Sequence, residues 1–138
     1  MIKNTNLIIK ETFALALKNH QNGNLKAAKN LYDKILKIDP KHISALNNLG
    51  LVFQTLMQHQ KAINSFEKAI EINPNNILTL NNLGNVLGSL GINQKAINSF
   101  EKAIEINPNY VDAHNNLGIV FKNIGENQKA INSFEKAI

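Results

Sequence analysis

Apolar residues recur at helical spacing along most of this 138-residue chain. Leu46, Leu49, Val52 and Phe53 fall on one face of a helix with 3.6 residues per turn. Ala62 opens a second stretch of the same kind a few residues later. The pattern predicts eight helices, over residues 5–21, 24–38, 42–56, 59–72, 76–90, 93–106, 110–124 and 127–138.

Glycine, proline and asparagine mark the ends of these helices. Gly23, Gly91 and Gly125 stand where a first helix of each pair would close with a left-handed residue. Second helices stop before an Asp-Pro or Asn-Pro step, because the residue before proline disfavours helical backbone. Asparagines are predicted N-caps: Asn93 and Asn127 for second helices, and Asn75, Asn76 and Asn109 for first helices.

The sequence repeats with a period of 34 residues. Residues 60–75 read QKAINSFEKAIEINPN, residues 94–109 are identical, and residues 128–138 repeat the first eleven. The three prolines are also spaced by 34. We therefore divide a single domain, residues 1–138, into a leader, a divergent first repeat, two full repeats and a partial fourth, over residues 1–8, 9–42, 43–76, 77–110 and 111–138.

Small residues recur once per repeat where paired helices are expected to approach. A glycine stands in the middle of three first helices, although glycine there costs about 1 kcal/mol relative to alanine, and an alanine stands early in the following helix. These residues are Gly50, Gly84 and Gly118, with Ala62, Ala96 and Ala130. One phenylalanine per repeat is predicted to fill the space between neighbouring repeats: Phe66, Phe100 and Phe134.

This pattern resembles the tetratricopeptide repeat, whose 34-residue unit carries a W-x-x-L-G-x-x-Y…A…F…A…P signature. In residues 43–76 the matching positions are Leu46, Leu49, Gly50, Phe53, Ala62, Phe66, Ala69 and Pro74. The first repeat departs most, with Thr12, Ala16, Asn19 and Ile35 at signature positions. The resemblance implies an all-α fold, an α-solenoid in which helix-turn-helix repeats form a right-handed superhelix. Its first helices would line a concave groove that holds a peptide or a partner helix.

The first-helix positions not used for packing carry mostly amides. An asparagine side chain offers a donor and an acceptor, as a peptide bond does, so a ladder of asparagines can bond an extended backbone. Asn48, Asn82 and Asn116 hold one phase in three repeats, and Ala14 holds it in the first. This is similar to the asparagine ladder in the tetratricopeptide domain of O-linked N-acetylglucosamine transferases. The other predicted peptide-binding residues are Asn47, Asn81, Asn115, Asn85, Gln54 and Lys122.

An alternative remains for these asparagines, since they can instead bond neighbouring helices or cap loops. A carboxylate clamp of the kind found in chaperone-binding relatives is not expected, because the corresponding groove positions carry no cation. Those positions are Phe13, Leu17, Asn47, Leu51, Leu78 and Asp112.

The net charge of +5 belongs to the first 42 residues, which hold eight lysines and three acids, whereas residues 43–138 hold seven of each. The basic end is either a solvated surface or a site for an acidic partner. It carries Lys26, Lys29, Lys34, Lys37 and Lys41. Nucleic acid is not expected as a partner, because arginine is absent and no aromatic series marks a base-stacking platform.

The sequence shows no pattern for catalysis or for a metal. Cysteine is absent, and His20, His42, His59 and His114 stand far apart. The carboxylate pair at Glu67 and Glu71 recurs in the next repeat on the expected solvent face. We therefore expect no enzyme activity, no catalytic residue, no metal site and no cofactor.

No apolar run reaches the length of a membrane span. We expect a cytoplasmic protein, and the bias towards lysine, asparagine and isoleucine without arginine favours a bacterial source.

The favoured function is a protein-binding scaffold with a peptide or protein partner. One alternative is the substrate-docking part of a larger transferase with a catalytic domain beyond residue 138. The other is a scaffold that self-assembles into a homo-oligomer through an uncapped last repeat, in which Ile131, Phe134 and Ile138 are expected to be exposed.

Overall fold

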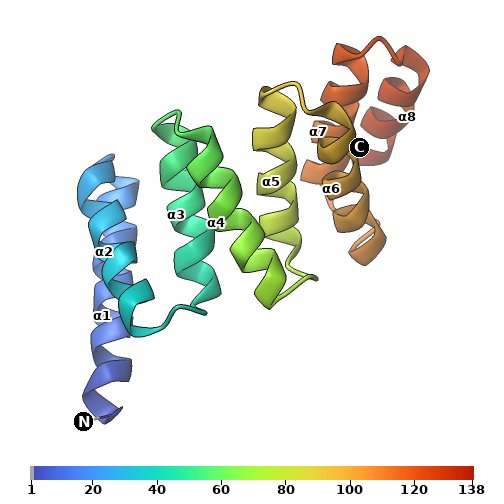
Figure 1. The fold of residues 1–138 in the computed structure, drawn as a ribbon. Helices are drawn as coiled ribbons and strands as arrows, with labels where there is room; N and C mark the ends of the chain where they lie inside the picture. Colours follow the sequence, from blue (N-terminus) through green and yellow to red (C-terminus); the bar gives the residue numbers. More distant parts are fainter. Residues whose placement is uncertain (1) are drawn as a thin grey trace. The chain divides into compact units, whose positions relative to one another are not determined.

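The computed structural model describes residues 2–138, with side chains from residue 4 onward. Over these residues the chain is all helical, without a strand (Figure 1). The helices are α1 (Ile2–Gln21), α2 (Leu25–Ile38), α3 (Ile43–Thr55), α4 (His59–Ile72), α5 (Ile77–Ser89), α6 (Asn93–Ile106), α7 (Val111–Asn123) and α8 (Asn127–Ala137).

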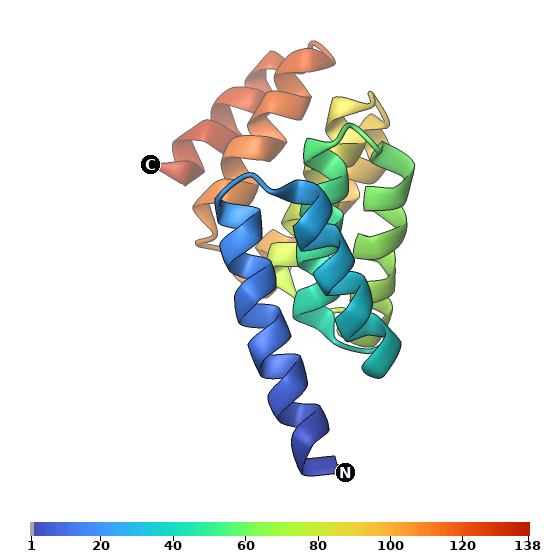
Figure 2. The same cartoon turned by 90° about the vertical axis from the view of Figure 1, so that its left-hand side faces the viewer.

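The predicted boundaries of α2 to α8 agree with the structure to within one residue. Helix α1 is longer than predicted, because it begins at Ile2 and runs through most of the expected leader. Met1 of that leader lies outside the described residues. The first turns of α1 extend beyond the end of α2 (Figure 2), and Leu7 and Ile8 are exposed there.

The helices form two compact units, Met1–Ile72 and Asn73–Ile138. In the first unit, α1 pairs with α2, α3 pairs with α4, and α2 also packs against α3. In the second unit, α5 pairs with α6, α7 pairs with α8, and α6 also packs against α7. This stacking of helical hairpins confirms the all-α solenoid class.

The turn inside each hairpin requires a left-handed residue. Gly91 has a φ of 75°, and its N–H donates to the carbonyl of Gly88 at 3.0 Å, while the next N–H, of Ile92, donates to Leu87 at 2.9 Å. This pair of bonds is the Schellman arrangement, which satisfies the last carbonyls of a helix. The glycines at this phase in the first and fourth repeats are also left-handed, which confirms the prediction.

In the hairpin of α3 and α4, the left-handed position is occupied by Met57, with a φ of 61°. A non-glycine residue in this region costs about 1–2 kcal/mol. The Met57 side chain is 73% exposed, so little packing offsets that cost.

We therefore expect Met57→Gly to raise the free energy of unfolding by about 1 kcal/mol. Urea denaturation followed by circular dichroism measures the change. The reverse exchange at the same phase, Gly91→Met, is the matched control and should lower stability by a similar amount. If Met57→Gly were no more stable than the parent, the left-handed backbone at Met57 would not lower the stability of the fold.

Several predicted N-caps were wrong. Asn93 and Asn127 are the first residues of α6 and α8, and the cap positions before them have no side-chain cap bond. The reason is that the Schellman turn leaves a single residue between the left-handed glycine and the next helix. Asn75 and Asn109 do not cap either, because the residues at the cap positions of α5 and α7 are Asn76 and Tyr110.

The caps of α3 and α5 are side chains of the loop that precedes each helix. Asn76 Oδ1 accepts from Thr79 N–H at 3.1 Å, as predicted. His42 Nδ1 accepts from Ala45 N–H at the same distance, so neutral histidine plays the same role in the preceding repeat.

In three of the four hairpins a phenylalanine ring packs against a glycine of the paired helix. A Cβ added to Gly84 would lie 2.6 Å from the Phe100 ring, and the same closeness recurs at Gly50 with Phe66. The glycine and the ring belong to the same repeat. The prediction that these rings fill the space between neighbouring repeats was therefore incomplete, although Phe100 also lines a hollow together with residues of α7.

Candidate peptide-binding surface

The first helices of the second unit, α5 and α7, lie in contact and enclose a hollow of about 210 Å³. Residues three and four apart share one face of a helix. Asn85, Gly88 and Ser89 of α5 therefore face the same space as the corresponding side of α7. The α7 residues that line the hollow are Asn116, Ile119, Val120 and Asn123.

The hollow combines amides with a small apolar area. Ile119 is about half exposed, and Gly88 has no side chain to fill the space. The Ser89 hydroxyl donates back to the carbonyl of Val86 at 2.8 Å, so its remaining capacity is that of an acceptor. The lining carries no charged side chain, which suits a neutral peptide backbone.

The structure brings only some of the predicted residues to this hollow. Asn85 and Asn116 line the hollow. Asn82 is half-buried and does not line it, and Asn115 and Lys122 are exposed at other positions of α7. Asn81 is buried and accepts a hydrogen bond from Asn116 Nδ2 at 3.1 Å. The alternative role, bonding between neighbouring helices, is thus observed for this pair.

In the first unit, Asn48 also bonds within the fold. Its side chain forms a hydrogen bond with the hydroxyl of Tyr32, a fully buried residue of α2. His20 Nδ1 of α1 is 3.2 Å from the same hydroxyl. Burial raises the pKa of Tyr32, and the Asn48 hydrogen bond acts in the opposite direction. The remaining predicted residues of this unit, Asn47 and Gln54, are half-buried.

The network around Tyr32 predicts a pH dependence of stability. Burial lowers the pKa of His20 from its ordinary value of 6.5. The unfolded chain takes up a proton near pH 6.5, so neutral His20 contributes stability above that pH, and the contribution is lost as the pH falls through the folded-state pKa. The urea concentration at the unfolding midpoint should therefore decrease as the pH is lowered from 7.5 to 5.5. The decrease should be smaller in His20→Gln.

The matched control for this prediction is His59→Gln, which leaves the Tyr32 network intact and should keep the pH dependence of the parent. Equal slopes for the parent and His20→Gln would show that His20 does not couple to folding.

Sequence reasoning missed several members of the hollow. Gly88, Ser89, Ile119 and Asn123 stand at first-helix positions free of core packing, and the same periodicity that selected the asparagines identifies them. Ser89 and Asn123 carry hydrogen-bonding groups but stand outside the phase of the asparagine ladder, and Gly88 and Ile119 carry no hydrogen-bonding side chain. The structure adds the apolar and small positions that give the hollow its shape.

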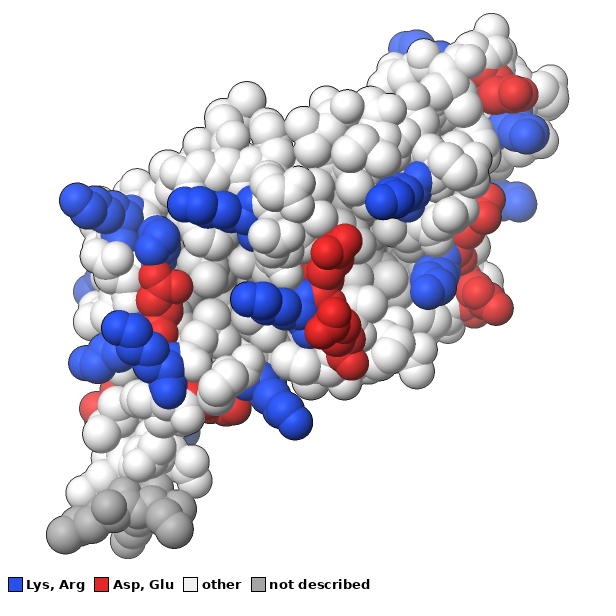
Figure 3. Space-filling view, in the orientation of Figure 1, with Lys and Arg blue, Asp and Glu red and all other residues white. Residues whose placement is uncertain are grey.

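Lysines gather over α1 and α2 (Figure 3). Lys29 Nζ forms an ion pair with Asp33 at 2.7 Å, and it is the only ion pair among residues 4–138. Within the same residues no group of three histidines or carboxylates is placed to hold a metal ion. None of the described helices is both long enough and apolar enough to cross a membrane.

Stacked hairpins with an exposed first-helix surface define an α-helical repeat protein of the protein-binding class. Profiles of the tetratricopeptide repeat match residues 13–42, 43–76 and 65–98, and a further profile of the same repeat matches residues 89–125. The chain belongs to the tetratricopeptide-repeat family, which confirms the sequence interpretation. The match over residues 43–76 coincides with the second repeat as divided above.

Solved structures show the same fold. A crystal structure of MamA is 26% identical, with a TM-score of 0.87 over 94% of this chain and 75% of that one. PilF of Pseudomonas aeruginosa is 29% identical, with a TM-score of 0.88 over 97% and 61%. An O-GlcNAc transferase mutant of Thermobaculum terrenum is 27% identical, with a TM-score of 0.80 over 85% and 22%. No curated protein sequence matches the chain.

Proposed function

We propose that this protein is a non-enzymatic scaffold that binds an extended segment of a partner protein along the amide-lined face of its first helices. The observation that carries the proposal is the hollow between α5 and α7, lined by Asn85, Asn116 and Asn123 without a charged side chain. Docking of substrate segments for a transferase is one use of such a surface.

Amide side chains would form hydrogen bonds mainly with the backbone of the partner segment and less with its side chains. The Asn116 amide donates one hydrogen to Asn81 and retains a second hydrogen and its carbonyl oxygen. Asn85 lies on α5, one turn after Asn81, and adds a second amide to the same hollow. Ile119 and Gly88 then give a shallow apolar position between them for one partner side chain.

The test is capture of partner segments on an array of peptides, using the full chain and single variants. We expect Asn85→Ala to weaken capture about tenfold, the value of one or two lost hydrogen bonds. Asn116→Ala should weaken it similarly, but it also removes the bond to Asn81. Asn85→Ala leaves that bond intact and is the cleaner variant.

The matched control is Asn98→Ala on α6, where the asparagine is exposed and pairs with Gln94 at 3.1 Å on the same helix. It should leave capture unchanged. Equal capture by the parent, Asn85→Ala and Asn116→Ala would rule out the amide-lined face as the binding surface.

A specific observation also favours self-association as a second function. Ile131 is 49% exposed, while Ile97 at the same phase is 7% exposed. Ile138 is fully exposed and Phe134 is half-buried. Sedimentation velocity over a concentration series tests this function, and a monomer at all concentrations would exclude it.

A further inference from the structure

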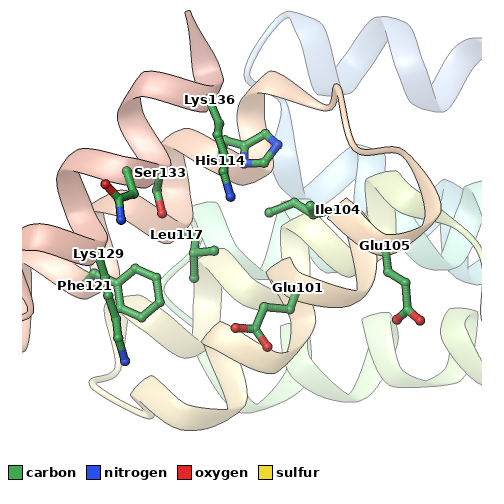
Figure 4. Close-up of a pocket in the computed structure, with 10 residues that line it drawn as sticks. Glu101, Ile104, Glu105, His114, Leu117, Phe121, Lys129, Ser133 and Lys136 are labelled. Atoms are coloured by element: carbon green, nitrogen blue, oxygen red, sulfur yellow. The ribbon is translucent and has the colours of Figure 1, made fainter.

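A larger cavity, of about 460 Å³, lies among α6, α7 and α8 (Figure 4). Its α7 residues are His114, Leu117 and Phe121. These residues are spaced by three and four and share one helix face, whereas Asn116 and the hollow described above belong to the other side of α7. The cavity is therefore a second site, separate from the amide-lined surface.

The floor of the cavity is apolar and is formed by Leu117 and Phe121 together with Ile104 of α6. The volume lies in the range of pockets that enclose a ligand or a large side chain, about 300–1,000 Å³. A floor of this kind stabilises an aromatic or aliphatic group by removing its surface from water.

Among the polar side chains that line the cavity, a histidine and a serine are buried. His114 is only 3% exposed, and its Nε2 lies 2.7 Å from the carbonyl oxygen of Pro108. A carbonyl can only accept, so Nε2 carries a proton, and Nδ1 is the acceptor in the corresponding neutral tautomer. In Figure 4 the imidazole lies at the end of the cavity that also holds Lys136. Thr12, Leu46 and Leu80 occupy this phase in the preceding repeats, so the histidine is particular to α7.

The walls of the cavity carry charges of opposite sign on two helices. Glu101 and Glu105 line it from α6, and Lys129 and Lys136 line it from α8. None of the four forms an ion pair within residues 4–138, although Lys129 Nζ lies 5.7 Å from the centre of the Phe121 ring. Asn132 and Ser133 of α8 also line the cavity. An apolar floor within polar and charged walls is suited to a single anchoring side chain on a polar partner surface.

We propose that this cavity receives an aromatic side chain with a hydrogen-bond donor, a tyrosine or a tryptophan, from a partner protein. The ring packs on Leu117 and Phe121, and its O–H or N–H donates to Nδ1 of His114. A phenylalanine or leucine side chain would leave that nitrogen desolvated and unpaired, which costs binding energy. A carboxylate has no proton to donate to Nδ1 of His114, although Lys136 lies at the same end of the cavity.

The experiment uses the full chain and two matched probes, N-acetyl-tyrosinamide and N-acetyl-phenylalaninamide, in titrations followed by amide NMR. We expect the tyrosine probe to shift the resonances of residues 104, 117, 121 and 133, and to bind about tenfold more tightly than the phenylalanine probe. His114→Leu should abolish that preference. This variant should fold, because leucine stands at the same phase in two other repeats.

A second variant, Ile104→Trp, fills the cavity from α6 and should abolish the shifts from both probes. Asn98→Ala, on the exposed side of α6 and outside the cavity lining, is the control and should bind both probes as the parent does. The proposal is overturned by shifts centred on Asn85 and Asn116, by the absence of saturable shifts, or by an unchanged tyrosine preference in His114→Leu. Each outcome is independent of peptide capture by the first helices, which Asn85→Ala tests.

Discussion

Replacing Phe100 by alanine should lower the free energy of unfolding by about 3–5 kcal/mol. The ring is 1% exposed and lies against the backbone of Gly84 in the paired helix. Its removal would leave a cavity that the two helices cannot close without losing their other contacts. Urea denaturation followed by circular dichroism gives the difference from the parent.

Phe134→Ala is a control within the same chain. Residues 94–104 and 128–138 are identical in sequence, but Phe134 is only half-buried. The same substitution should therefore cost clearly less in α8 than in α6. Equal losses at the two positions would show that local sequence, and not burial, determines the contribution of the ring.

Gly84→Ala should lower the free energy of unfolding by about 1–3 kcal/mol, although alanine is the better helix former by about 1 kcal/mol. The added Cβ would lie 2.6 Å from the Phe100 ring, well inside the usual carbon–carbon distance of about 3.5–4.0 Å. The ring is enclosed, so the helices must separate to admit the methyl group.

Gly88→Ala on the same helix separates this clash from the effect of helix propensity. Its Cβ would be 3.3 Å from Val120 Cγ2 and 3.8 Å from Ala96 Cβ. This substitution should leave stability unchanged or slightly raise it. If both variants were equally stable, close packing of Gly84 on Phe100 would be excluded. Adding Phe100→Leu to Gly84→Ala should restore part of the lost stability.

The helices were predictable from sequence because their signals are local. Apolar spacing, left-handed glycines and Asn-Pro steps located α2 to α8 to within one residue. The caps of α6 and α8 were not predictable in this way. The tight turn at Gly91 and Gly125 places Asn93 and Asn127 already inside the helix. An asparagine near a helix start is a cap only if the turn leaves it one residue outside.

The candidate binding surface was predictable only in part. Helical periodicity selected Asn85 and Asn116 as first-helix surface residues, and both line the hollow between α5 and α7, while their role in binding stays a prediction. It did not predict that Asn116 bonds to Asn81 or that Asn48 bonds to Tyr32. These bonds join residues of different helices, and their formation depends on how closely those helices approach.

The sequence by itself determined the helices and the period of 34, because helix boundaries follow from backbone hydrogen bonds and spacing within one or two turns and the period is read directly from the repeated residues. Only the tertiary structure decided which identical residues are buried. Ile97 and Ile131 have the same neighbours in sequence, yet they are 7% and 49% exposed. Ile97 lies on α6, and α7 packs against that helix. The burial of a side chain therefore depends on the helix that packs beside it and not only on the sequence of its own segment.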